Sequence, residues 1–420
     1  SDRCTRGLPF AGAPCYEART PVRPLSARHE PGTTTHRLCR PSFLIIGVGK
    51  CGTSSLYYYL TEHPQVRAAT QKQIQWFDHQ YHAAAFESDY LRRHFPRDLR
   101  AGEITGEASP GYAAYKAVPS RVRSHLAGVR ILCVVRDPAE RAWSAYHYNY
   151  LSVAGTKDAL PFDVLVTAEL RFLERLCGLL HDAENGASAA AGTRLVDLSS
   201  ECYGRHAAQT QVGAAAAAFF GSSSAQQHAK ALPRANEHLW RQLVGRSLYS
   251  VYLERWFRAF GRDDLFVVCS ERLATPETAT HELADVAAFL GLRAFDFAAA
   301  VGKGKYNAGD AHRGYGAVTS WDRAAEIERP DMPQSARAAI NAFSQPYNTR
   351  LFELAGRPRC PNWELASRAE RRSLASGLPG VVSTPAAAPG DEAEASSSPR
   401  RQQQPPDHFR ELLLLGSINS

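Results

Sequence analysis

The sequence predicts an α/β fold in which a parallel sheet is flanked by helices on both faces. Three observations indicate this: short uninterrupted apolar runs, glycine or proline turns directly after them, and segments of helical periodicity after the turns. Apolar runs without polar alternation are typical of strands buried on both faces, as in parallel sheets. In folds that alternate strands and helices, ligands bind at the carboxyl ends of the strands.

The first unit of this fold is expected at residues 43–60, which read FLIIGVGKCGTSSLYYYL. A strand over 43–46 leads into a glycine-rich turn, and Thr53, Ser54 and Ser55 can cap the helix that follows. Backbone N–H groups ahead of a helix favour anions, most often phosphate. The turn is therefore predicted to bind a phosphate group.

The position of the lysine distinguishes two kinds of phosphate loop. In a Walker A loop the lysine follows the second glycine, and the next residue carries a hydroxyl that binds Mg²⁺. Here Thr53 follows that glycine, and Lys50 comes two residues before Gly52. The sequence therefore favours a P-loop-like anion site without an ATPase loop, and a Mg²⁺-dependent phosphotransferase is the weakest of three hypotheses.

Further strands are expected near 66–69, within 129–138 and within 263–273. Pro138 ends the second of these runs and is typical of the first turn of a helix. The segment ETATHELADVAAFLGL after the third run is amphipathic, and Gly291 is expected to close its helix. Strands and helices therefore alternate along this part of the chain.

A second anion site is predicted in VVRDPAERAWSAY, residues 134–146. Arg136 directly follows a strand, and Ser144 lies about two turns along the helix that begins near Pro138. A guanidinium and a hydroxyl on one face can grip one phosphate, although an R-D-P strand end is equally consistent with a salt-bridged turn. Two phosphate sites on neighbouring strands fit a nucleotide that is phosphorylated at both ends.

With these two motifs the chain resembles the PAPS-dependent sulfotransferases, and most closely the Golgi carbohydrate (chondroitin and heparan) branch. GVGKCGTSSL resembles the 5′-phosphosulfate loop of that family and VVRDPAERAWSAY its 3′-phosphate motif, within a similarity over roughly 41–365. The resemblance implies one elaborated domain that transfers a sulfuryl group from PAPS to a hydroxyl of a polysaccharide or glycan. Adenosine 3′,5′-bisphosphate would be the other product, and no metal would be needed.

The resemblance also implies which residues bind the donor. Lys50 is expected near the bridging oxygen, where it would assist the departing 5′-phosphate. The expected PAPS-binding residues are Lys50, Cys51, Gly52, Thr53 and Ser54 in the first motif, Arg136 and Ser144 in the second, and Lys305, Arg313 and Gly314 in a late loop.

The general base is the point at which the sequence departs from the resembled branch. A Lys-Glu pair follows the second strand there, and the glutamate takes the proton of the acceptor hydroxyl. This chain has Lys72 but Gln73 in the glutamate position, and an amide cannot serve as a base near neutral pH. Glu107 is the first candidate to replace it, ahead of Asp78 and His147.

Gln73 is also consistent with two hypotheses in which no residue replaces the glutamate. In the first hypothesis the protein binds a nucleotide or a glycan, has the sulfotransferase fold and shows little or no turnover. In the second, its acceptor is more acidic than a sugar hydroxyl and needs little help from a base. The first of these is the alternative to the enzymatic hypothesis.

Charge and composition distinguish the two ends of the chain, and one internal segment, from the predicted domain. The formal net charge is +7, and residues 1–40 contain seven arginines against three acidic residues, which predicts a poorly ordered stem and not a nucleic-acid module. A low-complexity insertion is expected near 205–235 and a disordered tail over 366–420. No apolar stretch approaches the roughly 18 residues of a membrane span, so an anchor is expected only in a segment that this chain does not contain.

The chain has nine cysteines, and the odd number leaves at least one unpaired. Cys133 and Cys269 lie in apolar runs and are expected to be inert core thiols. The resemblance implies the Golgi lumen or membrane, and Cys177 with Cys202 is the first disulfide expected. The other candidates for disulfides are Cys4, Cys15, Cys39 and Cys360. No Cys-x-x-Cys or His/Cys cluster indicates a metal.

Overall fold

The computed structural model describes residues 15–21, 33–151, 161–177, 243–307, 316–325, 330–358, 360–361 and 363. The strands of its main sheet are β3 (Phe43–Gly47), β4 (Val66–Ala68), β5 (Ile104–Ala108), β6 (Arg130–Val135) and β7 (Leu265–Cys269). They pair in the order β4-β5-β3-β6-β7, and every pair is parallel. All four predicted strands are found, with the one over 43–46 at the centre of the sheet.

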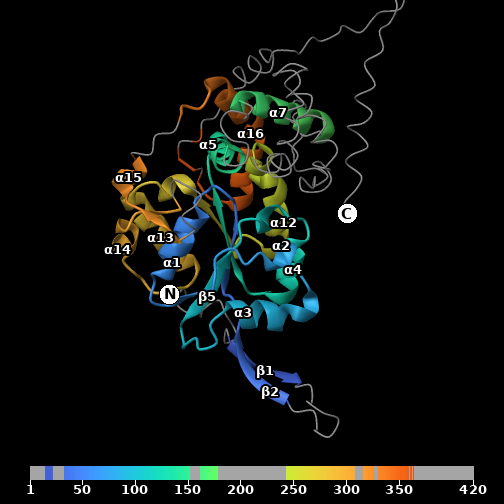
Figure 1. The fold of residues 1–420 in the computed structure, drawn as a ribbon, viewed down its shortest axis with the longest axis vertical. Helices are drawn as coiled ribbons and strands as arrows, with labels where there is room; N and C mark the ends of the chain where they lie inside the picture. The colour runs from blue at the N-terminus through green and yellow to red at the C-terminus, as the bar shows by residue number, and fades with distance from the viewer. Residues whose placement is uncertain are drawn as a thin grey trace, which may run out of the picture. The chain divides into compact units, whose positions relative to one another are not determined.

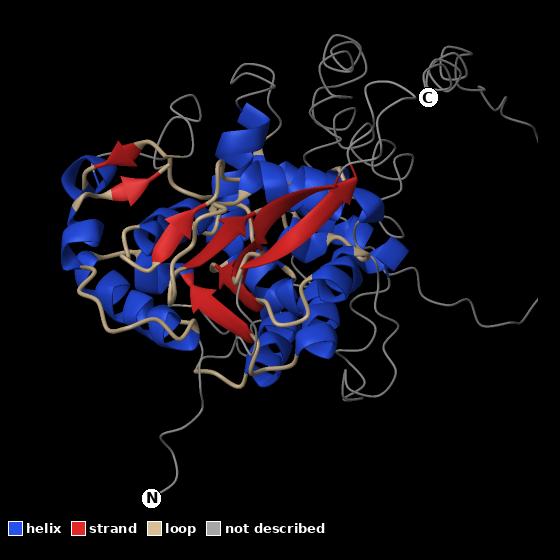
Figure 2. Cartoon of the chain, turned by 90° about the horizontal axis from the view of Figure 1, so that it is seen from below, coloured by secondary structure: helices blue, strands red, loops and turns tan. Residues whose placement is uncertain are grey.

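The described helices are α1 (Thr53–Thr61), α2 (Trp76–His79), α3 (Arg92–His94), α4 (Val118–His125), α5 (Pro138–Ala145), α7 (Phe162–Cys177), α12 (Tyr249–Phe260), α13 (Pro276–Phe289), α14 (Ala298–Gly302), α15 (Trp321–Ala325) and α16 (Gln334–Ala355). Figure 1 shows α1 and α13 on one side of the sheet and α4 and α12 on the other. Figure 2 shows the strands of the main sheet lying between helices. The predicted α/β class is confirmed.

Shorter segments connect these elements. Turns of 3₁₀ helix cover Ala83–Ala85, Tyr112–Ala114, Gly245–Ser247 and Ser270–Leu273, and π-helical turns cover Phe86–Leu91 and Tyr146–Leu151. Two short antiparallel pairs, β1 (Cys15–Pro21) with β2 (Thr33–Cys39) and β8 (Lys305–Tyr306) with β9 (Val318–Thr319), lie outside the main sheet.

The start of α5 agrees with the sequence prediction, whereas the capping predicted at the start of α1 does not occur. Pro138 is in the first turn of α5, and the side chain of Asp137 accepts a hydrogen bond from the Glu140 N–H at 2.9 Å. At α1 the preceding residue is Gly52, and no side chain caps the helix. The capping expected from Thr53, Ser54 and Ser55 is therefore wrong, because these residues lie inside the first turn of the helix.

Strand β5 is not predicted by the sequence, although it lies between β4 and β3. Its residues, ITGEA, mix small and polar side chains, yet all five are buried. Thr105 and Glu107 are satisfied by hydrogen bonds to groups elsewhere in the chain, at Arg67 O and the Tyr90 hydroxyl. The apolar pattern that reveals a buried strand is therefore absent here.

Part of the segment expected to be a poorly ordered stem is an antiparallel hairpin. Strands β1 and β2 pair from Cys15 opposite Cys39, and a disulfide joins these two residues. The Tyr16 hydroxyl donates to Glu87 Oε1 at 2.6 Å, and Arg37 donates to the Leu99 carbonyl at 3.1 Å. For these two strands the expected lack of order is wrong, because cross-strand pairing and contacts with residues 87–99 hold them.

A second disulfide joins Cys269 at the end of β7 to Cys360. The expectation that Cys269 is an inert core thiol is wrong, because the chain after α16 returns to the end of β7. Cys133 is a buried free thiol, as expected. Cys202, the insertion near 205–235 and the tail over 366–420 lie outside the described ranges, so the structure does not describe the pairing of Cys177 with Cys202.

The close pairing of β3 and β5 gives a test of the sheet. A Cβ at Gly106 would lie 2.5 Å from the Phe43 carbonyl oxygen and 2.6 Å from the Phe43 ring. We expect Gly106→Ala to lower the free energy of unfolding by about 1–3 kcal/mol, as overpacking does, in chemical denaturation. Gly128→Ala, whose Cβ would meet nothing within 4 Å, is the control. Equal stability of the two variants would contradict this packing.

Candidate active site

The loop between β3 and α1 has the backbone of an anion site. Lys50 and Gly52 have positive φ angles of 72° and 94°, and a Cβ built at Gly49 would meet nothing within 4 Å. The first N–H groups of a helix point toward the residues before it, and at α1 no side-chain cap accepts from them, so they suit an anion. The residues present therefore fit a phosphate group.

Two side chains of this loop have different roles. The Lys50 Nζ lies 3.5 Å from the centroid of the Tyr148 ring, which belongs to the turn after α5. Cys51 is buried, with its Sγ 3.7 Å from the Tyr249 hydroxyl. Burial raises the pKa of the Cys51 thiol to about 11, so this side chain is neutral at pH 7. The positive charge of the loop is therefore that of Lys50.

The loops that follow β3 and β6 are held together by two buried side chains. The Tyr249 hydroxyl donates to the Arg136 carbonyl at 2.6 Å and accepts from the Arg136 N–H at 3.3 Å. Arg141, on α5, donates to the Gly49 carbonyl at 3.3 Å and to Ser247 Oγ at 2.7 Å. Because β3 and β6 are hydrogen-bonded neighbours, the two predicted anion loops lie at adjacent strand ends.

The second anion motif has the predicted local geometry. Arg136 follows β6 directly, and Ser144 is a buried residue of α5. The Arg136 Nη2 donates to Glu140 Oε2 at 3.1 Å, one turn along the helix. The salt bridge that the sequence allows at this strand end is thus present, and the Arg136 side chain is 24% exposed. The guanidinium is therefore partly open to solvent.

The late loop is only partly described. Lys305 lies on β8, with its Nζ 4.8 Å from the centroid of the Trp321 ring. The neighbouring chain is attached to α1, because the Tyr59 hydroxyl donates to the Gly304 carbonyl at 2.7 Å and the Tyr306 N–H donates to Ser55 Oγ at 3.2 Å. Arg313 and Gly314 lie outside the described residues.

Glu107 is fully buried and accepts hydrogen bonds from three hydroxyl groups. Its Oε1 accepts from Tyr90 at 2.9 Å and from Tyr112 at 2.8 Å, and its Oε2 accepts from Ser109 at 2.6 Å. Burial raises the pKa of Glu107 to about 7, although the three hydroxyl donors oppose that rise. Both carboxylate oxygens are therefore already engaged by the protein.

The hydroxyl groups on Glu107 also hold the segment that contains Gln73. Ser109 Oγ accepts from the Gln75 N–H at 2.9 Å, and the Tyr112 hydroxyl accepts from the Trp76 N–H at 3.0 Å. The Gln73 N–H donates to the Ala108 carbonyl at 3.0 Å, at the end of β5. Gln73 and Gln75 both have positive φ angles, 64° and 55°, so the backbone of this segment is closely specified.

Lys72 lies beside this network. It is buried, and desolvation lowers its pKa to about 8, while attraction to Glu107 acts in the opposite direction. A lysine with a lowered pKa and a glutamate with a raised pKa are typical of desolvated functional sites, because an ion pair alone would shift the two pKa values in the opposite directions. Glu107 belongs to β5, where it lies opposite Leu44 of β3, so this pair lies beside the strand that leads into the first anion loop.

The two other base candidates differ in their surroundings. The Asp78 side chain is buried, which raises its pKa; its Oδ1 accepts from the His79 N–H at 2.9 Å. No described residue donates a hydrogen bond to Asp78 Oδ2, which lies 3.8 Å from His79 Nε2. The His147 ring packs edge-on against Trp143, with centroids 4.3 Å apart. His147 is therefore part of an aromatic cluster.

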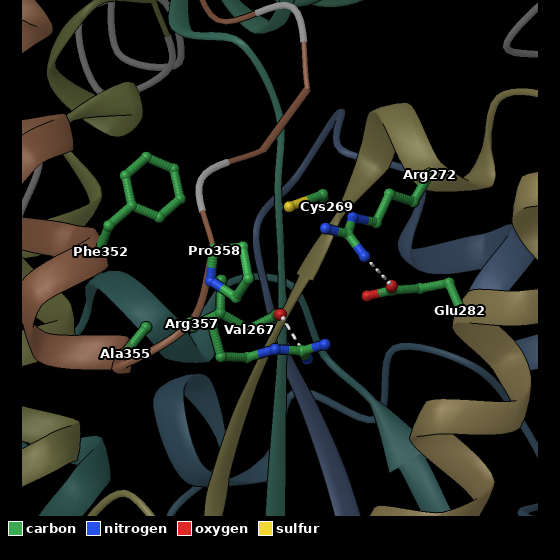
Figure 3. Close-up of a pocket in the computed structure, with 8 residues that line it drawn as sticks. All are labelled: Val267, Cys269, Arg272, Glu282, Phe352, Ala355, Arg357 and Pro358. Atoms are coloured by element: carbon green, nitrogen blue, oxygen red, sulfur yellow. Dashed lines mark hydrogen bonds and ion pairs between the residues drawn. The ribbon is translucent and has the colours of Figure 1, made fainter.

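A pocket elsewhere in the described fold lies beside the Cys269–Cys360 disulfide (Figure 3). In it Arg272 Nη1 lies 3.5 Å from Glu282 Oε2, and Arg357 donates to the Val267 carbonyl at 3.2 Å. None of the predicted site residues lines it. Its arginines are thus engaged by protein groups, and the pocket is separate from the two anion loops.

An α/β sheet with two anion loops at neighbouring strand ends is typical of nucleotide-binding proteins. Within the described ranges, no group of three or more His, Cys, Asp or Glu side chains is arranged to hold a metal ion. Among the described helices, none combines the length and apolar character that crossing a membrane requires.

Comparison with known proteins finds sulfotransferases. The chain is 35% identical over 114 residues to the membrane-associated sulfotransferase kil1 of Dictyostelium discoideum, 27% of this chain and 24% of that protein. It is 38% identical over 106 residues to mouse heparan sulfate glucosamine 3-O-sulfotransferase 3B1, 25% of this chain and 26% of the relative. The human 3B1 enzyme is 34% identical over 140 residues, 33% of each chain. The resemblance to carbohydrate sulfotransferases is confirmed.

These matches span only about a quarter to a third of the length of the curated relatives. No family model matches the chain. Among solved structures, a sulfotransferase from Alicyclobacillus acidocaldarius aligns with a TM-score of 0.44 and 20% identity, over 77% of this chain and 99% of its own.

Sequence reasoning missed the two residues that join the anion loops. Arg141 and Tyr249 carry no motif signal of their own, since an arginine inside a helix and a tyrosine at a helix start are common. Both lie in stretches that resemble the family, RDPAERAW and RSLYSVYLERW. Position within these stretches is the signal that could have identified them.

The raised pKa of Glu107 predicts a pH dependence of stability. The ordinary pKa of a glutamate is 4.5, and that of folded Glu107 is about 7. From pH 4.5 to 7 the unfolded chain releases this proton and the folded protein keeps it, so the folded state loses stability, by about 1.4 kcal/mol per unit of pKa difference. Above pH 7 this loss is complete.

Glu107→Gln removes the titrating group and keeps an oxygen that the tyrosines can donate to. The variant should not share the loss of stability that wild type shows from pH 4.5 to pH 7. We therefore expect the free energy of unfolding of the variant minus that of wild type to rise over this range and to stay level above pH 7. Denaturation at a series of pH values measures the difference. A difference that is constant over the whole range would contradict the raised pKa.

Proposed function

We propose that the protein transfers a sulfuryl group from PAPS to a carbohydrate hydroxyl. The observation that carries this proposal is the juxtaposition of two anion loops, joined by Tyr249 and Arg141 at the ends of β3 and β6. A donor with phosphate groups at both ends fits such a pair of loops. The relatives are named for heparan sulfate, which supports a polysaccharide or glycan acceptor.

In this proposal each end of the donor has its own set of residues. The loop from Lys50 to Ser54 and the start of α1 bind the 5′-phosphosulfate, and Arg136 with Ser144 binds the 3′-phosphate. PAPS supplies the sulfuryl group and a bisphosphate leaving group. Lys50, whose Nζ lies over the Tyr148 ring, neutralises charge on the bridging oxygen as the 5′-phosphate departs.

We assign the proton of the acceptor hydroxyl to Asp78 and a positioning role to Glu107. Both oxygens of Glu107 accept hydrogen bonds from hydroxyl groups, whereas Asp78 Oδ2 lies 3.8 Å from His79 Nε2 but accepts no hydrogen bond from the described residues. A carboxylate oxygen without a hydrogen-bond donor is the better proton acceptor. Gln73, earlier in the same segment, orients the acceptor through its amide.

The donor site is tested by Lys50→Ala and Arg136→Ala. Each variant removes a cation that the transition state or the nucleotide requires, so we expect transfer of labelled sulfate from PAPS to desulfated polysaccharides to fall by about 10²-fold or more. Lys303→Ala, which removes an exposed lysine paired with Glu62, is the control and should be unchanged. Undiminished transfer in Lys50→Ala and Arg136→Ala would refute the assignment.

The base is tested by Asp78→Asn alone and together with Gln73→Glu. We expect Asp78→Asn to abolish turnover and to retain nucleotide binding in calorimetry, because it removes a base and no cation. Gln73→Glu supplies a carboxylate in the position that the resembled branch uses and should restore transfer. Full activity of Asp78→Asn would show that another group takes the proton.

The alternative is a nucleotide- or glycan-binding protein with little or no turnover, which the amide at Gln73 favours. Nucleotide binding without product across a broad panel of acceptors would support it, and activity gained in Gln73→Glu would explain it. Binding of ATP that depends on Mg²⁺ would instead favour a phosphotransferase.

We propose that the protein works in the Golgi lumen or at its membrane. The disulfides Cys15–Cys39 and Cys269–Cys360 support an oxidising compartment. The names of the relatives, which include a membrane-associated sulfotransferase, agree with the secretory pathway. Thiols can be counted under denaturing conditions in protein from its natural source. Nine free thiols would contradict this location.

A further inference from the structure

The arginine assigned to the 3′-phosphate shares a carboxylate with a second arginine. Glu140 Oε2 accepts from Arg136 Nη2 at 3.1 Å, and Glu140 Oε1 accepts from Arg337 Nη2. The three side chains are 24%, 34% and 27% exposed in the order Arg136, Glu140 and Arg337. One carboxylate therefore lies between two guanidinium groups, within reach of solvent.

The fold fixes this arrangement from two directions. Glu140 is in the first turn of α5, where Asp137 caps its N–H, and it is one turn beyond Arg136. Arg337 is in the first turn of α16, where its N–H donates to the Pro333 carbonyl at 3.1 Å, and α16 packs against α5. The start of a distant helix thus delivers a second cation to the end of β6.

The described carboxylates around the two guanidinium groups differ in burial. Glu140 is partly exposed and pairs with both arginines. Asp137, which accepts from the Glu140 N–H, and Glu271, which accepts from the Asp137 N–H at 2.7 Å, are largely buried, and desolvation raises the pKa of both, which disfavours their charged forms. Because partly exposed ion pairs contribute little to stability, an anion of higher charge can replace Glu140 at small cost.

Phosphate has the geometry that this pair of guanidinium groups requires. A guanidinium presents N–H groups in a planar fork, which matches the oxygens of a phosphate as it matches those of a carboxylate. The guanidinium groups of Arg136 and Arg337 already contact the two carboxylate oxygens of Glu140, and they can contact two oxygens of one phosphate in the same way. A monoester phosphate carries more charge than the carboxylate and competes for both.

We propose that Arg337 is a second ligand of the 3′-phosphate and that Glu140 holds both arginines in place until that phosphate displaces it. The inference rests on the proposed function, since it assumes that the nucleotide binds at Arg136. Arg337 thereby makes the site selective for a nucleotide with a 3′-phosphate over one without it. Glu140 weakens binding of the nucleotide, because its release must accompany binding.

The test compares adenosine 3′,5′-bisphosphate with AMP in titration calorimetry on the full chain. We expect Arg337→Ala to weaken binding of the bisphosphate about tenfold or more, as loss of a charge-assisted hydrogen bond does, and to leave AMP binding unchanged. Arg350→Ala is the matched control, on the same helix, since Arg350 is 26% exposed, close to the 27% of Arg337, and pairs with Glu254 and Glu353. It should change neither affinity.

Two more variants keep the test decisive if Arg337→Ala folds poorly. Arg337→Lys keeps the charge without the fork and should lose part of the selectivity, and Glu140→Gln should bind the bisphosphate more tightly than wild type does. An unchanged ratio of the two affinities in both Arg337 variants, or weaker binding in Glu140→Gln, overturns the inference and leaves the proposed function standing. Wild-type protein that binds neither nucleotide overturns both.

Discussion

The hydroxyl group of Tyr249 is the contact on which the proposed site depends. It bonds to both backbone groups of Arg136 and lies beside Cys51 in the loop after β3. Tyr249 comes from α12, 113 residues after Arg136 and 198 after Cys51, and so brings a third segment to the ends of two parallel strands. Arg141 adds a second link, from α5 to the Gly49 carbonyl. These buried groups set the separation of the two loops that we propose to bind one nucleotide.

The buried carboxylate of Glu107 has a comparable role in the segment that we propose to contact the acceptor. A carboxylate without water is costly to the folded state, and hydrogen bonds from Tyr90, Tyr112 and Ser109 offset part of that cost. Two of those hydroxyl groups in turn hold backbone N–H groups of the segment that contains Gln73. The position of this segment is thus determined by polar contacts beneath it, and the side chain at position 73 can change with little effect on the backbone.

The sequence predicted the elements whose signal is local. The runs within 129–138 and 263–273 are contiguous and apolar, and they became β6 and β7; Pro138 marked the start of α5. Strand β5 was missed because the partners of its polar residues lie elsewhere in the chain, and Cys269 was misjudged because its partner follows α16. The motif residues of the site were identified by resemblance, but the contacts of Tyr249 and Arg337 depend on how distant helices pack and have no local pattern.

The disulfide between Cys269 and Cys360 closes a span of 91 residues that includes α13 and α16. Just beyond it, the Trp363 ring lies 6.0 Å from that of Tyr249. The covalent link therefore fixes this part of the chain against the tyrosine that joins the two loops of the proposed nucleotide site, and closing so long a span restricts the unfolded chain considerably. Recombinant material from a reducing cytosol would lack this link, so an expression host with an oxidative folding pathway is the appropriate source of protein for biochemical work.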